Sequence, residues 1–177
     1  MSQLGTTYLL TLAALSVTFV GFSGLVIMLR QTLGGDMSRL DVLITRIFIQ
    51  LGFIVAGAAL LPELMALFAV PEELIWRTAS AAAALPALLF GLTYDTRRRA
   101  ASGLATPFAV WIDIGVLLSA ALILILNTIG LVVKPGPAPF ALALTVILFL
   151  AGWAYLQALN MLLRRHHATR GGRDAGA

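Results

Sequence analysis

The sequence predicts an all-α, polytopic integral membrane protein: a bundle of five transmembrane helices, with the N-terminus outside and the C-terminus inside the cell. Three observations predict this fold class. The mean hydropathy is +0.96, and 11% of the residues are charged, against about 25% in soluble domains. Five apolar runs each exceed the roughly 20 helical residues that cross a bilayer. Arginines gather at alternate ends of these runs.

The first two transmembrane spans are expected at residues 7–29 and 42–70. The first, TYLLTLAALSVTFVGFSGLVIML, follows a segment without a positive side chain and is too long for the apolar region of a signal peptide. The second contains Pro62 and Glu63. Because proline removes a backbone donor, we expect the helix to kink or restart there.

The remaining spans are expected at residues 74–94, 108–133 and 140–163. Proline and glycine separate them, most clearly in the KPGP sequence between the last two. Residues 1–167 are therefore predicted to form a single transmembrane bundle. The polar, glycine-rich residues 168–177 are predicted to be a flexible cytoplasmic tail.

The distribution of basic residues predicts the orientation, because loops on the cytoplasmic side are enriched in Lys and Arg. With the N-terminus outside, every basic residue except Arg77 and Lys134 lies on the inner side. Arginine far outnumbers lysine, and Ala, Gly and Leu are abundant, which favours a bacterial origin. We therefore expect a multi-pass protein of the bacterial cytoplasmic (inner) membrane. Trp76 and Trp111 fit positions in an interfacial aromatic belt.

Small residues recur along the predicted third span at i+4 spacing: Ala79, Ala83, Ala87 and Gly91. Such a stripe lets a neighbouring helix approach closely. We interpret it as helix packing within the monomer, with an oligomer interface as the alternative.

Several polar side chains are predicted at one depth, in the cytoplasmic third of the membrane. Asp113, in FAVWIDIGVLL, lies roughly 8 Å past the inner boundary, and Arg46 lies about 6 Å past it. Gln50 is one turn deeper than Arg46, and Gln157 and Asn160 fall at a similar depth. An unpaired charge at this depth costs a few kcal/mol. We therefore expect Arg46 and Asp113 to form an ion pair or to share a hydrated cavity, with the three amides around them.

Structural explanations stand beside this polar site. Arg46 can extend to the lipid headgroups, and Asp113 can hold two helices in register. Gln157 and Asn160 can be hydrogen-bonding contacts between helices, each contributing about 0.6 kcal/mol. A second, outer pair is predicted between Glu63 and Arg77.

The sequence argues against several chemistries. Cysteine is absent, and neither histidine nor lysine occurs in the predicted spans. These absences exclude bis-histidine haem, a retinal Schiff base and a Ser-His protease within the membrane. Phosphate-loop and HExxH motifs are also absent. We therefore predict no catalytic residues, no cofactor and no metal site. The basic residues lie beside apolar runs, so they indicate topology and not nucleic-acid binding.

The first functional hypothesis is a solute- or ion-handling protein, channel-like or transporter-like, that uses the polar site. The alternative is a non-catalytic membrane subunit, assembly factor or regulator of another membrane complex. A lipid-modifying enzyme has the least support. The expected partners are the lipid bilayer and either further copies of this chain or another membrane protein.

Overall fold

The computed structural model describes residues 3–32, 39–103, 106–131 and 134–174, and for residues 3–4, 26–27, 29–31, 39–41 and 158–174 it describes the backbone alone. In these residues the chain forms five α-helices, each long and apolar enough to cross a membrane. They are α1 (Gln3–Thr32), α2 (Arg39–Leu67), α3 (Glu72–Ser102), α4 (Phe108–Ile129) and α5 (Pro137–Asp174). The prediction of an all-α chain with five such helices is therefore confirmed.

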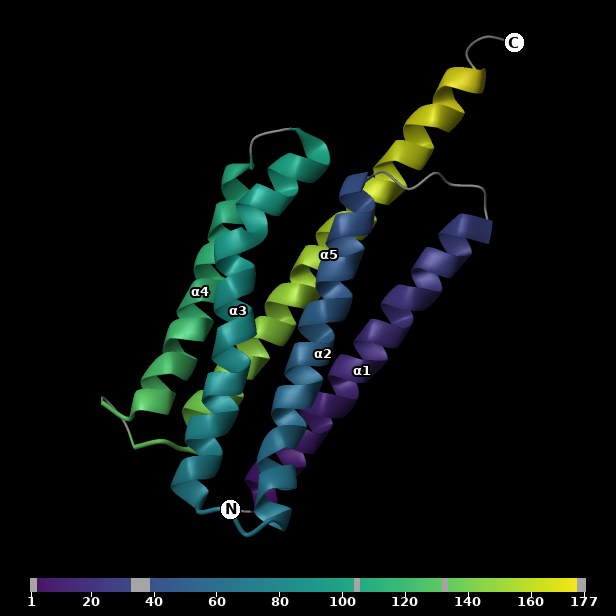
Figure 1. The fold of residues 1–177 in the computed structure, drawn as a ribbon. Helices are drawn as coiled ribbons and strands as arrows, with labels where there is room; N and C mark the ends of the chain where they lie inside the picture. Colours follow the sequence, from purple (N-terminus) through teal and green to yellow (C-terminus); the bar gives the residue numbers. More distant parts are fainter. Residues whose placement is uncertain (1–2, 33–38, 104–105, 132–133, 175–177) are drawn as a thin grey trace.

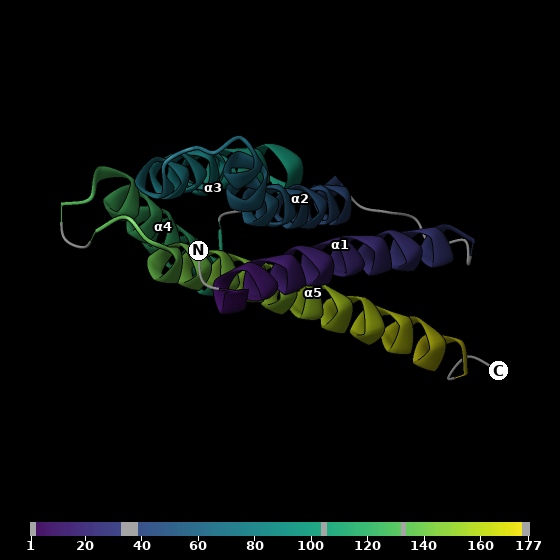
Figure 2. The same cartoon turned by 90° about the horizontal axis from the view of Figure 1, so that it is seen from below.

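Successive helices run in opposite directions (Figure 1). We call the end where α1, α3 and α5 begin the N-terminal end. The opposite end, where α2 and α4 begin, is the C-terminal end. Figure 2 shows α2 and α3 on one side of the bundle and α5 on the other. α5 contacts α4, α2 and α1, so it closes the bundle along one side.

The ends of α3 and α4 follow from local backbone chemistry. α3 continues past the apolar run through its three arginines to Ser102, because arginine is a good helix former. Gly103 then adopts a left-handed conformation (φ 66°), and its N–H donates to the Arg99 carbonyl at 2.8 Å. Gly130 ends α4 in the same way (φ 74°), several residues before the predicted limit at 133.

α2 and α5 each continue past a residue where the sequence suggested an interruption or an end. α2 continues as one helix through Pro62, which is buried. A restart at this proline is therefore absent. α5 continues to Asp174, past the start of the predicted tail at residue 168.

The small-residue stripe of α3 lies in the most extensive helix–helix interface, the one with α4. Ala79, Ala83, Ala87 and Gly91 are all buried. A methyl group at Gly91 would lie 2.7 Å from a terminal carbon of Leu118 on α4. The stripe therefore brings α3 and α4 together within the monomer.

Trp76 is buried in the core and does not lie in an interfacial belt. Its side chain is 1% exposed, and its ring packs against that of Phe140 on α5 at 5.8 Å between centroids. Its indole N–H donates to Glu72 at 3.4 Å. The belt prediction for Trp76 is wrong because α5 covers the N-terminal end of α3. Trp111, by contrast, is exposed.

Gly52 lies at a close contact between α2 and α1. A Cβ atom there would overlap the side chain of Val20 and lie 3.6 Å from the Ser16 carbonyl oxygen. Valine has few alternative rotamers, so it cannot move aside. We expect Gly52→Ala to destabilise the protein by about 1–3 kcal/mol through overpacking, measured as the midpoint of thermal unfolding in detergent.

The matched control is Gly57→Ala, on the same helix, where an added methyl group meets no atom within 4 Å. This substitution should leave the midpoint unchanged or raise it, because alanine favours helix more than glycine does. Equal midpoints for the two variants would contradict the close approach at Gly52.

Candidate functional site

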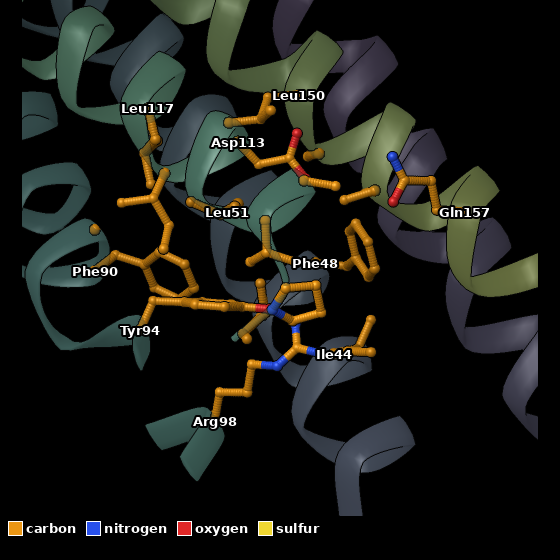
Figure 3. A pocket seen from close by; sticks show the side chains of 18 residues that line it. Ile44, Phe48, Leu51, Phe90, Tyr94, Arg98, Asp113, Leu117, Leu150 and Gln157 are labelled. Atoms are coloured by element: carbon orange, nitrogen blue, oxygen red, sulfur yellow. The ribbon is translucent and has the colours of Figure 1, made fainter. Parts of the chain in front are cut away.

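A cavity of about 190 Å³ lies between α2, α3, α4 and α5, in the half of the bundle nearer the C-terminal end. Its walls are mostly apolar and aromatic, and Figure 3 shows the side chains that line it. Four polar or charged residues also line it: Tyr94, Arg98, Asp113 and Gln157. The cavity is therefore an apolar space with few polar groups, which is the usual character of a small-molecule site.

Asp113 lies on the buried face of α4. Val110, Ile114 and Leu117 line the cavity beside it and share that face. No hydrogen bond or ion pair joins the Asp113 carboxylate to another residue in the described part of the chain. The carboxylate is thus presented to the cavity without a protein partner.

The face of α3 that lines the cavity carries Phe90, Tyr94 and Arg98 at i+4 spacing. The rings of Phe90 and Tyr94 are 5.9 Å apart. Arg98 lies one turn nearer the helix end, and its Nε atom is buried without a hydrogen-bond acceptor among the described residues. From the sequence, Arg98 is only one of the basic residues expected on the inner side. The i+4 relation to Phe90 and Tyr94 is the signal that distinguishes it from Arg97 and Arg99.

The connection from α3 to α4 is fixed beside the cavity by Asp95. Its Oδ1 accepts a hydrogen bond from the Thr106 hydroxyl at 2.6 Å. Its Oδ2 is 2.9 Å from Nε of Arg99. Pro107, which lines the cavity, precedes the first turn of α4 in an extended conformation. Asp95 thus holds the start of α4 against the end of α3.

α2 and α5 supply the remaining walls. Phe48 of α2 lines the cavity and packs edge-to-face on Tyr155 of α5 at 5.4 Å. Phe19 of α1 contacts both rings, at 6.3 Å from Phe48 and 5.5 Å from Tyr155. Gln157 lines the cavity from α5. The Asn160 side chain lies outside the part of the chain whose side chains are described.

Arg46 and Gln50 do not line the cavity. Ile44, Ile47, Phe48 and Leu51 line it from α2. At 100° per residue, Arg46 falls on the opposite side of the helix from these residues. Its side chain is exposed, and it forms no ion pair with Asp113.

The structure therefore brings together two of the five residues of the predicted polar site, Asp113 and Gln157. Tyr94, which the sequence places at the same inner level, and Arg98 line the cavity with them. The functional role of the polar site, and the pairing of Arg46 with Asp113, remain predictions.

Arg77 and Glu63 lie toward the N-terminal end. Arg77 forms an ion pair with Glu73, one turn earlier on α3, at 2.6 Å. The Glu63 Oε1 and Arg77 Nε atoms are buried without hydrogen-bond partners among the described residues. The predicted pair between Glu63 and Arg77 is not formed in this arrangement and stays a prediction.

The N-terminal end is closed by Asn127 of α4, which is buried. Its Nδ2 donates to the Ser80 hydroxyl of α3 at 2.7 Å and to the Gly136 carbonyl at 3.2 Å. Its Oδ1 accepts from the Gly136 N–H at 3.0 Å. One side chain thus joins α3, α4 and the segment leading into α5. We call this set of three hydrogen bonds the Asn127 clamp.

The two ends of the bundle therefore differ. At the N-terminal end the Asn127 clamp and the Trp76–Phe140 contact hold α3, α4 and α5 together. Toward the C-terminal end α4 and α5 diverge (Figure 1). The cavity lies in this diverging half, with Asp113 and Arg98 in its wall.

The described residues contain no cluster of three or more His, Asp or Glu side chains that would hold a metal ion. The chain matches no family model, and we find no significant similarity to a curated protein or to a solved structure. The functional argument therefore depends on the geometry of the cavity.

Proposed function

We propose that this chain is a small transporter-like protein of the bacterial inner membrane that binds a solute in the cavity beside Asp113. The observation that carries the proposal is the contrast between the two ends of the bundle. A transporter binds its solute in a site that is open toward one side of the membrane and closed toward the other. A cavity in the diverging half, behind a hydrogen-bonded and aromatic closure, fits that requirement.

The proposed orientation places the C-terminal end in the cytoplasm, because the basic residues predict it. Arg97, Arg98 and Arg99 lie at this end of α3. The cavity would then open toward the cytoplasm. The serine and threonine hydroxyls of the helices support a membrane location, since many of them donate to carbonyls one turn earlier, as at Ser16, Thr18 and Ser119. Their donors thereby remain satisfied in hydrocarbon.

The absence of cysteine from the sequence allows a direct test. Ala154 lines the cavity, and Ala143 of the same helix is fully buried toward the closed end. The two residues are about three turns apart on nearly the same face of α5. We expect a membrane-impermeant thiol reagent to modify Ala154→Cys from the cytoplasmic side, and to modify Ala143→Cys at least about tenfold more slowly, because only the cavity admits water.

A transporter also requires the cavity to become open to the other side. Ala154→Cys should therefore react from the periplasmic side at a lower but measurable rate, and Ala143→Cys should react there as well when the closed end opens. Ala154→Cys that resists the reagent from both sides would overturn the proposal. If Ala154→Cys reacted only after the protein had been purified from native membranes, the result would favour the alternative function. In that case the chain would be a subunit of another complex, and a partner would fill the cavity.

A further inference from the structure

We propose that the cavity binds a small organic zwitterion with an apolar body, with its cationic group toward Asp113 and its anionic group toward Arg98. This inference rests on the proposed function only in taking the cavity as the binding site. The opposite charges of Asp113 and Arg98 in the cavity wall indicate the class of ligand.

Neither charge forms an ion pair with a described residue, although the Asp95 carboxylate also acts on the Arg98 guanidinium at longer range. The Asp113 carboxylate forms no hydrogen bond or ion pair among the described residues. The Arg98 Nε atom is buried and has no acceptor there. The neighbouring Arg99 differs, since it is paired with Asp95 at 2.9 Å. Buried polar groups in proteins are almost always hydrogen-bonded, so the Arg98 Nε atom points to an acceptor that a ligand supplies. The partly exposed Asp113 carboxylate presents the opposite charge to the same cavity.

The two charges lie on opposite sides of an apolar space. Figure 3 shows Asp113 and Arg98 on either side of the cavity, with Phe48, Phe90 and Tyr94 between them. A ligand that reaches both charges must therefore carry its own charges at separate positions, joined by an apolar segment that contacts these rings.

Electroneutrality selects a zwitterion over a simple ion. A cation beside Asp113 would leave the Arg98 guanidinium with only the Asp95 carboxylate as a counter-charge, and Asp95 already pairs with Arg99. An anion beside Arg98 would leave the Asp113 carboxylate without a counter-charge among the described residues. An uncompensated charge is costly where the dielectric constant is low. A ligand with both charges matches both residues and adds no net charge to the site.

The volume limits the apolar body. An engineered cavity of about 150 Å³ in another protein binds benzene, so a cavity of about 190 Å³ accepts a body somewhat larger than one benzene ring. A chain of about six carbons falls in this range. The probe that matches these requirements is 6-aminohexanoate.

The experiment measures binding of 6-aminohexanoate to the full chain in lipid nanodiscs by calorimetry. Hexylamine and hexanoate serve as single-charge analogues of the same length. We expect 6-aminohexanoate to bind at least about tenfold more tightly than either analogue. It should also slow thiol modification of Ala154→Cys, which places the ligand in the cavity.

Asp113→Asn and Arg98→Gln should each weaken 6-aminohexanoate binding at least about tenfold, to the level of a single-charge analogue. Asp113→Glu and Arg98→Lys keep the charges and should retain binding within a few-fold, which separates lost charge from lost folding. Arg97→Gln is the matched control: Arg97 is exposed and does not line the cavity, so binding should not change.

Three results would overturn the inference. Hexylamine binding as tightly as the zwitterion, with Arg98→Gln without effect, would indicate a cation site. Hexanoate binding as tightly, with Asp113→Asn without effect, would indicate an anion site. No detectable binding of 6-aminohexanoate, while Ala154→Cys still reacts from both sides, would exclude the zwitterion and leave the proposed function standing.

Discussion

Replacing Asn127 with leucine should lower the free energy of unfolding by about 2–4 kcal/mol. Leucine is close in size to asparagine but cannot hydrogen-bond. The buried Ser80 hydroxyl and the part-buried Gly136 N–H and carbonyl, which now bond to Asn127 at 2.7, 3.0 and 3.2 Å, would lose these partners. The measurement is the midpoint of thermal unfolding in detergent, and the decrease should appear without any change in helix content.

A second substitution tests the cause. Ser80→Ala in the Asn127→Leu background should recover part of the loss, because one of the three groups left without a partner is then removed. Ser119→Ala is the control on α4, since that serine is exposed and bonds only to the Gly115 carbonyl at 2.8 Å. If Asn127→Leu and Ser119→Ala had the same small effect, the Asn127 clamp would not stabilise the closed end.

Replacing Trp76 with alanine should cost about 3–5 kcal/mol, the range for removing a buried aromatic side chain and leaving a cavity. The side chain is 1% exposed, and Phe140, its ring neighbour, is 0% exposed, so the surrounding helices cannot easily close the space. The readout is again the unfolding midpoint. When Trp76→Ala is combined with Ala143→Cys, the thiol reagent should modify the cysteine faster. The reason is that the Trp76–Phe140 contact, like the Asn127 clamp, holds the N-terminal end together.

Trp153→Ala provides the matched control for Trp76→Ala. Trp153 is on α5 and is 50% exposed, so its removal leaves no internal cavity. Its effect on the midpoint should be less than about 1 kcal/mol, as for most changes away from the core. Similar losses for the two tryptophans would show that Trp76 is not part of the core.

The sequence predicted the number of helices, because the length of an apolar run is a one-dimensional quantity. Asp113 and Gln157 were expected at one level, and both line the cavity. Span limits were less accurate. α3 runs well past residue 94 since arginine supports a helix as well as leucine does.

Rotation about the helix axis could not be predicted in the same way. Arg46 was placed near the level of Asp113, but it lies on the face of α2 turned away from the cavity. In a lipid environment the apolar residues of a span do not reveal which face contacts protein. For the same reason the sequence did not distinguish Arg98 from the two arginines beside it. It also did not show that Trp76 faces the core.

Arg77 forms its ion pair within its own helix and not with the residue expected on another helix. Arg77 was expected beside Glu63 of α2, yet it bonds Glu73, one turn earlier on its own helix. Such i,i+4 pairs need no particular tertiary arrangement. The Asn127 contacts could not be foreseen either, because Ser80 and Gly136 come close to it only after α3, α4 and α5 are assembled.

The Asn127 clamp holds α4 near the N-terminal end of the bundle, so a tilt of α4 about the clamp would move its other end the most. Asp113 is 14 residues from Asn127, or about 21 Å along the axis. A tilt of about 10° around the clamp displaces Asp113 sideways by about 4 Å over that distance, using the same helical rise. A small rearrangement of these three hydrogen bonds would thus suffice to move the carboxylate by more than the width of a water molecule.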